Sequence, residues 1–214
     1  MEAGAVPPRG PGSSSDTEPT GGRLAGWTPA DPGPLGLAAF ALTTFVLSMF
    51  NAHLVSDAGE PVVLGLAFAY GGLAQLLAGM WEFRTGNTFG AVAFTSFGAF
   101  WISFFILVAF FAKEIPEGDA GHAIGLYLWA WGIFTTYMFI ASLRTTGAVA
   151  LVFLLLAITF ILLGIGNSGG NEDIVKWGGY LGIATAIAAW YASFAAVLNS
   201  TFGRTVAPVF PLKR

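Results

Sequence analysis

The chain has 214 residues, of which 55% are hydrophobic and only 10% are charged, with a net charge of −3. Soluble domains carry about 25% charged residues, so this composition cannot coat a soluble surface and indicates an integral membrane protein. The lack of a basic block argues against nucleic-acid binding. The lack of cysteine excludes disulfides and thiolate metal sites.

Residues 1–34 differ in composition from the rest of the chain. They are rich in Pro, Gly, Ser and Thr, with almost no large apolar side chain before Leu24 and Trp27. Such a segment buries too little surface to offset its ordering entropy, so we expect a disordered tail. A transmembrane domain over 35–200 and a short C-terminal tail over 201–214 should follow.

Beyond the tail, apolar runs alternate with short polar breaks, and each run is close to the roughly 20 residues that cross a bilayer as a helix. The expected fold is an all-α, multi-pass protein of the cell membrane. Its six transmembrane helices are predicted over 35–55, 62–82, 91–111, 123–143, 146–166 and 177–198. The fourth break is so short that helices four and five should form a tight antiparallel hairpin.

The distribution of basic residues predicts the orientation of these helices. The side that holds only Lys113 and Lys176 would face outward. The side that carries both termini would hold seven basic residues, namely Arg9, Arg23, Arg84, Arg144, Arg204, Lys213 and Arg214. We therefore expect both termini to be cytoplasmic.

Ionisable residues avoid the centres of the predicted spans, and Glu82 and His53 lie only at span ends. Proton pumps place carboxylates or histidines inside the bilayer, and membrane enzymes need clustered ligands or acid and base groups. We therefore expect no proton coupling through a titrating side chain inside the membrane. We also expect a protein that is not an enzyme and has no metal or cofactor.

Uncharged polar side chains are present in the spans, and their spacing is ordered. In the first span one helical face carries Phe40, Thr43, Thr44, Leu47, Ser48 and Asn51. In the second, Gln75 lies near mid-bilayer, where an unpaired amide would cost roughly 2–7 kcal/mol. These groups either line a pathway or hydrogen-bond between helices as packing contacts.

Two further features have alternative interpretations. Gly178, Gly182 and their small neighbours form a stripe on the last span, which suits packing within one protomer or contact between subunits. Asn87 or Thr88 should cap the third helix, although the free amides of a helix start also suit an anion.

Several motifs, read in chain order, resemble the acetate uptake transporter family, also called the succinate–acetate permeases. Residues 31–37, Asp-Pro-Gly-Pro-Leu-Gly-Leu, are similar to the Asn-Pro-Ala-Pro-Leu-Gly-Leu signature of that family, with Asp31 in place of Asn. Further matches are Tyr70-Gly71-Gly72-Leu73-Ala74-Gln75, Gly86-Asn87-Thr88-Phe89-Gly90, Phe94-Thr95-Ser96-Phe97-Gly98, and Phe202-Gly203-Arg204-Thr205 followed by Pro208.

The resemblance implies a carrier for small monocarboxylates or dicarboxylates, such as acetate or succinate, assembled as a hexamer with one pathway per protomer. It also implies a Phe–Tyr–Leu constriction, which falls on Phe40, Phe97 and Leu156, with Phe97 in place of the tyrosine. Neutral donors would then hold the substrate, and the expected pathway residues are Thr43, Thr44, Ser48, Asn51, Gln75, Asn87 and Thr95. A coupled proton would cross on the substrate as the neutral acid.

Two other functions fit the same residues. A channel for a small neutral solute such as ammonia also needs no buried charge, and it would carry no current. A membrane scaffold would use the polar faces only for packing and would move no substrate.

Overall fold

The computed structural model describes residues 27 and 29–212, so most of the predicted disordered tail lies outside the described residues. In the described part, six helical stretches are long and apolar enough to cross a membrane, which confirms the predicted all-helical fold. They are α1 (Gly33–Asn51), α2–η2–α3 (Val62–Phe68, Ala69–Ala74, Gln75–Thr85), α4–η3–η4 (Thr88–Ile106, Leu107–Phe111, Ala112–Glu114), α5 (Glu117–Ser142), α6 (Gly147–Ser168) and α7 (Glu172–Phe202). A short turn, η1 (Asp57–Gly59), precedes α2.

Several helices extend beyond the predicted spans because polar residues cap them outside the apolar runs. Asn87 caps α4 and accepts a hydrogen bond from the Gly90 backbone N–H at 3.2 Å, as predicted. Asn171 caps α7 in the same way, which places its start five residues before the predicted one. Gly86 ends α3 with φ +79°, a conformation that glycine adopts without steric cost.

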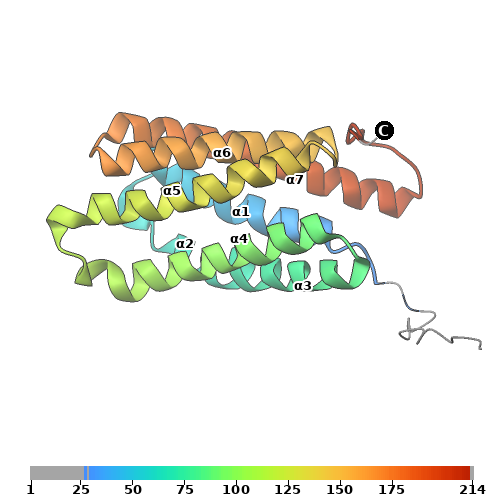
Figure 1. Ribbon diagram of the computed structural model, residues 1–214, viewed down its shortest axis with the longest axis horizontal. Coiled ribbons are helices and arrows are strands. Elements are labelled where there is room, and N and C mark those ends of the chain that lie inside the picture. The colour runs from blue at the N-terminus through green and yellow to red at the C-terminus, as the bar shows by residue number, and fades with distance from the viewer. Residues whose placement is uncertain (1–26, 28, 213–214) are drawn as a thin grey trace, which may run out of the picture.

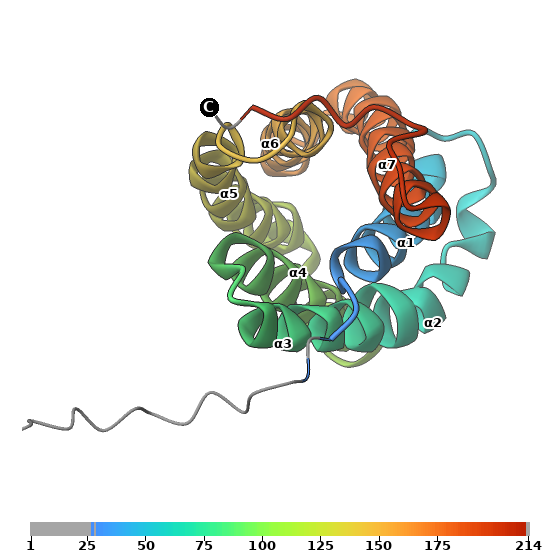
Figure 2. The same cartoon turned by 90° about the vertical axis from the view of Figure 1, so that its right-hand side faces the viewer.

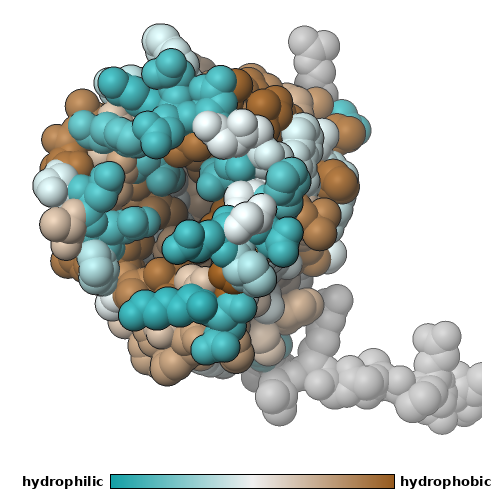
Figure 3. Space-filling model, turned by 90° about the vertical axis from the view of Figure 1, so that its left-hand side faces the viewer, coloured by the Kyte–Doolittle hydropathy of each residue, from teal (hydrophilic) through white to brown (hydrophobic). Residues whose placement is uncertain are grey.

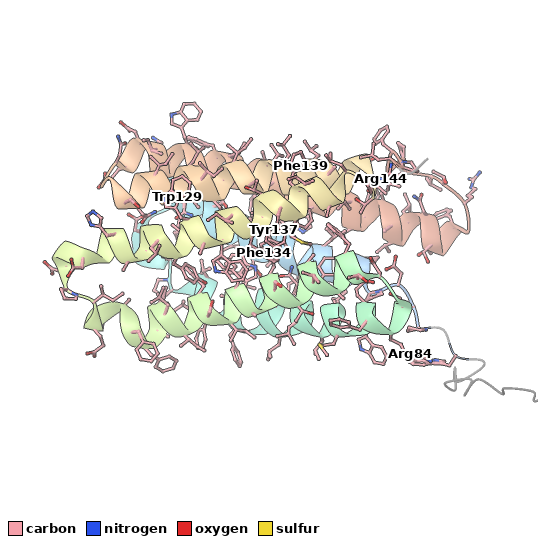
Figure 4. The ribbon with its side chains drawn as sticks, in the orientation of Figure 1. Arg84, Trp129, Phe134, Tyr137, Phe139 and Arg144 are labelled. Atoms are coloured by element: carbon pink, nitrogen blue, oxygen red, sulfur yellow. The ribbon has the colours of Figure 1, made fainter. Side chains whose placement is uncertain are left out.

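The six stretches form a ring when the molecule is viewed along its long axis (Figure 2), in the order α1, α2–α3, α4, α5, α6 and α7. The described chain begins and ends at the same end of the bundle, here called the termini end (Figure 1). The turns that carry Arg84 and Arg144 also lie at this end (Figure 4). The other end is called the opposite end.

Small residues bring α7 close to its neighbours. Gly182 packs against Ser48 of α1, and Gly178 packs against Leu163 of α6, so closely that a Cβ at either position would collide. Both residues belong to the small-residue stripe of the last span. The structure therefore assigns them to packing within the protomer.

The seam between α4 and α5 is closed mainly by aromatic side chains. Phe97 and Phe100 of α4 lie against Trp131 of α5, with ring centroids 6.0 and 5.1 Å apart. Beside them, Ser103 Oγ and Tyr127 OH form a hydrogen bond of 2.7 Å. Rings close this seam because their long side chains bridge helices whose backbones are well separated.

Residues 203–212, here called the C-terminal segment, fold back along the termini end. The Gly147 backbone N–H donates to the Phe210 carbonyl at 2.7 Å, and the Leu212 N–H donates to the Thr145 carbonyl at 3.0 Å. Asn199 Oδ1 accepts from the backbone N–H groups of residues 206 and 207. The predicted tail therefore has fixed partners on the α5–α6 turn over its described length, and residues 201–202 belong to α7.

Candidate functional site

Two cavities enter the bundle, one from each end. The opposite-end cavity has a volume of about 230 Å³ and is lined by α1, α4, α5, α6 and the segments between α1–α2 and α4–α5. The termini-end cavity has a volume of about 920 Å³ and opens between the starts of α1, α4 and α6. One water needs roughly 10–15 Å³, so each cavity has room for a molecule of several non-hydrogen atoms.

The wall of the opposite-end cavity is mostly apolar, with a few neutral polar groups. Figure 3 shows this end of the molecule, where hydrophilic side chains surround a hollow. Glu60 is the one charged residue among the described lining residues. The uncharged polar lining residues are Thr44, Ser48, Asn51, Tyr127, Thr159 and Asn167, together with the indole of Trp101.

The termini-end cavity is wider and carries charge. Its described lining includes Asp31, Glu82 and Arg144, alongside Asn87 and Asn199. Glu82 is only 2% exposed although it belongs to this wall. Val209 and Pro211 of the C-terminal segment form part of the rim.

An aromatic partition separates the two cavities, and Phe97 lies at its centre. Phe40 and Phe160 belong to the opposite-end lining, and Phe153 belongs to the termini-end lining. The ring centroid of Phe97 lies 5.9 Å from that of Phe40, 6.5 Å from that of Phe160 and 6.0 Å from that of Phe153. One layer of apolar side chains therefore stands between the two water-accessible spaces.

The three residues of the predicted constriction come together at this partition. Phe40, Phe97 and Leu156 are 4%, 3% and 4% exposed and belong to one core cluster. Phe40 and Leu156 face the opposite-end cavity. The structure thus brings all three side chains together in the partition, and their role as a constriction stays a prediction.

The predicted polar pathway residues fall into two groups. Thr44, Ser48 and Asn51 line the opposite-end cavity, and Asn87 lines the termini-end cavity. Thr43, Gln75 and Thr95 line neither of these cavities.

Helix packing explains why Thr43, Gln75 and Thr95 lie away from the cavities. Thr43 donates to the Ala39 carbonyl at 2.9 Å, and its side chain packs against Gly71 of η2. Thr95 of α4 packs against Gly79 of α3. Gln75 begins α3 and is 1% exposed. These side chains lie where helices meet, because the small residues beside them allow close approach.

Four buried side-chain atoms have no hydrogen-bond partner within the described chain: Thr44 Oγ1, Gln75 Oε1, Thr95 Oγ1 and Trp101 Nε1. Thr44 and Trp101 belong to the opposite-end lining. Buried polar groups usually have partners, so the Thr44 hydroxyl and the Trp101 N–H, a donor, are suited to hydrogen-bond a water or a small polar guest. The sequence analysis did not identify Trp101, whose position in an aromatic-rich run resembles ordinary core.

Glu82 and Arg144 are two further cavity-lining residues that sequence reasoning missed. Both had been assigned only to span ends or connecting turns. The sequence signal that could have identified Glu82 is its spacing, because it follows Gly79 by three residues and so shares the helix face that meets α4.

Comparison with known proteins identifies relatives of known activity. The chain is 38% identical over 180 residues to the succinate-acetate/proton symporter SatP of Escherichia coli, covering 84% of this chain and 95% of the relative. It is 46% identical over 173 residues to ammonia transport outward protein 2 of Saccharomyces cerevisiae, covering 78% of this chain and 61% of that protein. The chain spans about two thirds of the length of the fungal relatives that it matches.

A solved structure has the same fold. The structure of the bacterial acetate channel SatP superposes with a TM-score of 0.80 at 37% identity, covering 85% of this chain and 99% of that one. A family model described as the GPR1/FUN34/yaaH family matches residues 18–214. These matches confirm the resemblance that the motifs predict, and the chain belongs to the GPR1/FUN34/yaaH family.

Proposed function

We propose that the protein transports small carboxylates, with acetate as the principal substrate and succinate as a second, across the cell membrane. The pathway runs within each protomer from one cavity to the other. The observation that carries this proposal is the pair of cavities, which enter from opposite ends and stop at a single aromatic layer.

The partition supports passage of the neutral acid. Dewetting at an apolar constriction is a barrier to ions, and Phe40, Phe97 and Leu156 offer no polar atom to a bare anion. The carboxylate would enter a cavity as an anion and cross the partition with a proton. A relative that is named a succinate-acetate/proton symporter supports this coupling.

Neutral donors hold the substrate in this scheme. Thr44, Ser48 and Asn51 would bind it in the opposite-end cavity, and Asn87 would contact it in the termini-end cavity. Weak, neutral binding at successive sites allows the substrate to leave as well as to enter. Thr43, Gln75 and Thr95 would act through helix packing.

Orientation and assembly complete the proposal. The positive-inside rule supports a cytoplasmic termini end, because Arg84, Arg144 and Arg204 lie there and only Lys113 and Lys176 lie at the opposite end of the described chain. Single cysteines introduced at positions 58, 118 and 169 should react with an impermeant reagent in whole cells, and cysteines at positions 86 and 145 should not. The protein would assemble as a homohexamer, by family resemblance, which native mass spectrometry can test.

Purified protein in liposomes provides the direct test of function. Labelled acetate should enter faster than in protein-free liposomes, increasingly so as the outer pH falls, and unlabelled succinate should compete. Equal acetate uptake with and without protein across the pH series would contradict the proposal.

Ammonia is the second candidate substrate, and the relative named ammonia transport outward protein 2 favours it. A neutral solute would also pass an apolar partition. Internal alkalinisation on addition of ammonium, without acetate-dependent flux, would select ammonia over acetate.

A further inference from the structure

Glu82 is a buried carboxylate that the transport scheme above does not use. It lies in the last turns of α3, in the wall of the termini-end cavity, and is 2% exposed. Removing an ionised carboxylate from water is costly unless a cation or several donors compensate. The groups around Glu82 therefore determine whether it is charged or protonated.

The close neighbours of Glu82 are neutral apart from Asp31, since a Cβ at Gly33 would lie 3.0 Å from Asp31 Oδ1 and 3.6 Å from Glu82 Oε1. Glu82 Oε2 accepts a hydrogen bond from Thr85 Oγ1 at 3.0 Å. A Cβ at Gly90 would lie 2.5 Å from Glu82 Oε1 and 2.6 Å from Asn87 Nδ2, so the carboxylate and this amide meet over the glycine. The absence of a side chain at Gly90 thus leaves space for the carboxylate at the start of α4.

The charged groups near Glu82 are few. Asp31, before α1, and Arg144, in the α5–α6 turn, share the cavity wall with it. Arg84 extends outward, and its Nη2 donates to the Trp27 carbonyl at 3.4 Å (Figure 4). Within the described chain, no Lys, Arg or His nitrogen forms an ion pair with Glu82. The starts of α1 and α4 favour its charged form through their dipoles, whereas Asp31 opposes it.

A substrate anion changes the balance between the charged and the protonated form of Glu82. With Glu82 ionised, the cavity wall holds two carboxylates and one guanidinium, so an entering carboxylate meets net negative charge. Two carboxylates that share one site favour taking up one proton between them. Binding of a proton removes negative charge from the cavity and therefore strengthens binding of the anion. By the same coupling, a bound anion strengthens binding of the proton.

We propose that Glu82 is the proton-binding residue of transport and exchanges its proton with the substrate carboxylate in the termini-end cavity. In one direction the proton moves from a Glu82 carboxyl oxygen to a substrate oxygen. The neutral acid then crosses the partition, and the Glu82 carboxylate that remains takes up a proton from a hydronium ion of the solution at the termini end. In the other direction, Glu82 accepts the proton of the arriving acid, the anion leaves, and Glu82 releases the proton to water at the same end. This inference rests on the proposed carboxylate transport.

The test compares Glu82→Gln with the wild-type protein in liposomes. Glutamine keeps the shape and the acceptor for Thr85 but cannot exchange a proton. Initial uptake of labelled acetate should fall about a hundredfold at pH 7, the lower end of the range that one positioned acid–base group contributes. At acid pH, where the substrate brings its own proton, uptake by the variant should approach the wild-type rate after subtraction of protein-free flux.

Two further variants separate this role from a structural one. Glu82→Asp keeps the acid and should retain the wild-type pH profile at a reduced rate, even if Glu82→Gln fails to fold. Glu117→Gln makes the same chemical change at an exposed position that lines neither cavity, and it should behave as wild type.

The outcomes are distinguishable. A Glu82→Gln profile that matches wild type, or a loss in Glu82→Gln that is equal at every pH, would overturn the proton-binding role. A Glu82→Asp variant that loses the wild-type pH profile would overturn it as well. Absence of acetate flux in the wild-type protein would instead refute the proposed function.

Discussion

The two cavities differ in how they meet a charged solute. The termini-end cavity is wide, and Asp31, Glu82 and Arg144 belong to its wall. The opposite-end cavity is narrower, and neutral hydroxyls and amides interrupt its apolar wall. An anion would therefore meet several ionisable groups on one side of the partition and, past Glu60 at the mouth, neutral donors on the other. The pathway is asymmetric, so the two directions of transport should respond to different substitutions.

Removal of the aromatic partition between the two cavities should have the largest effect on transport. Phe97→Ala would join the two cavities, because that ring lies between Phe40 and Phe153. We expect uptake of larger dicarboxylates to rise about tenfold, which corresponds to about 1.4 kcal/mol less barrier. Labelled succinate uptake relative to acetate uptake measures the change.

The control for this variant is Phe194→Ala, since Phe194 is 58% exposed on α7. Truncation of a buried Phe costs roughly 3–5 kcal/mol, so size-exclusion chromatography must first establish that Phe97→Ala assembles. If the assembled variant kept the wild-type rate and size selectivity, the partition would not be the barrier.

Substitution of two adjacent threonines of α1 should give the next largest effect on transport. Thr44 lines the opposite-end cavity with an unpartnered hydroxyl, whereas Thr43 bonds to the Ala39 carbonyl and packs against Gly71. Thr44→Val should raise the half-saturation concentration for acetate about fivefold, which corresponds to the loss of one hydrogen bond worth about 1 kcal/mol. Thr43→Val should leave that concentration unchanged. The reverse result would place the pathway on the other face of α1.

A smaller effect is expected at Gln75, which lies outside both cavities. Gln75→Leu removes a buried oxygen that has no partner in the described chain. Thermal stability should stay constant or increase, because an unsatisfied buried polar group costs about 1–3 kcal/mol. Acetate uptake should change little. A strong loss of uptake from folded protein would return Gln75 to the pathway.

The smallest effect concerns Glu60, at the mouth of the opposite-end cavity. Partial burial, and then the negative charge of Asp57, raise the pKa of Glu60. Its carboxylate therefore takes up a proton at a higher pH than an ordinary Glu, and acidification removes negative charge from the mouth. Glu60→Gln should speed acetate entry from this side by less than about twofold at neutral pH, since salt screens exposed charge. The increase should vanish at acid pH, and slower entry in the variant would contradict this account.

These residues also indicate what sequence can predict. Apolar runs set the number of spans, because backbone polar groups in lipid must be satisfied within helices. The first span carries one polar face, yet Thr43 and Thr44 contact different surroundings because their side chains point about 100° apart on a helix. Helical spacing alone could not tell which of them meets Gly71 and which meets the cavity.

The charged residues were harder to interpret. Glu82 lies at a span end in sequence, a position where a carboxylate is normally solvated. Its burial depends on Gly90, which comes from the next span and leaves room for its oxygen. Contacts of this kind depend on how helices pair, and periodicity within one helix does not report that pairing.

The C-terminal segment also has a consequence for biogenesis. The first backbone N–H groups of α6 donate to the carbonyls of Phe210 and Val209, which are synthesised after the last span, α7. A nascent chain with all six spans inserted therefore still lacks the partners of that helix start. The α6 start is completed only when residues 209–210 have left the ribosome, so a bundle truncated before them presents free N–H groups that quality-control proteases can recognise as unfinished.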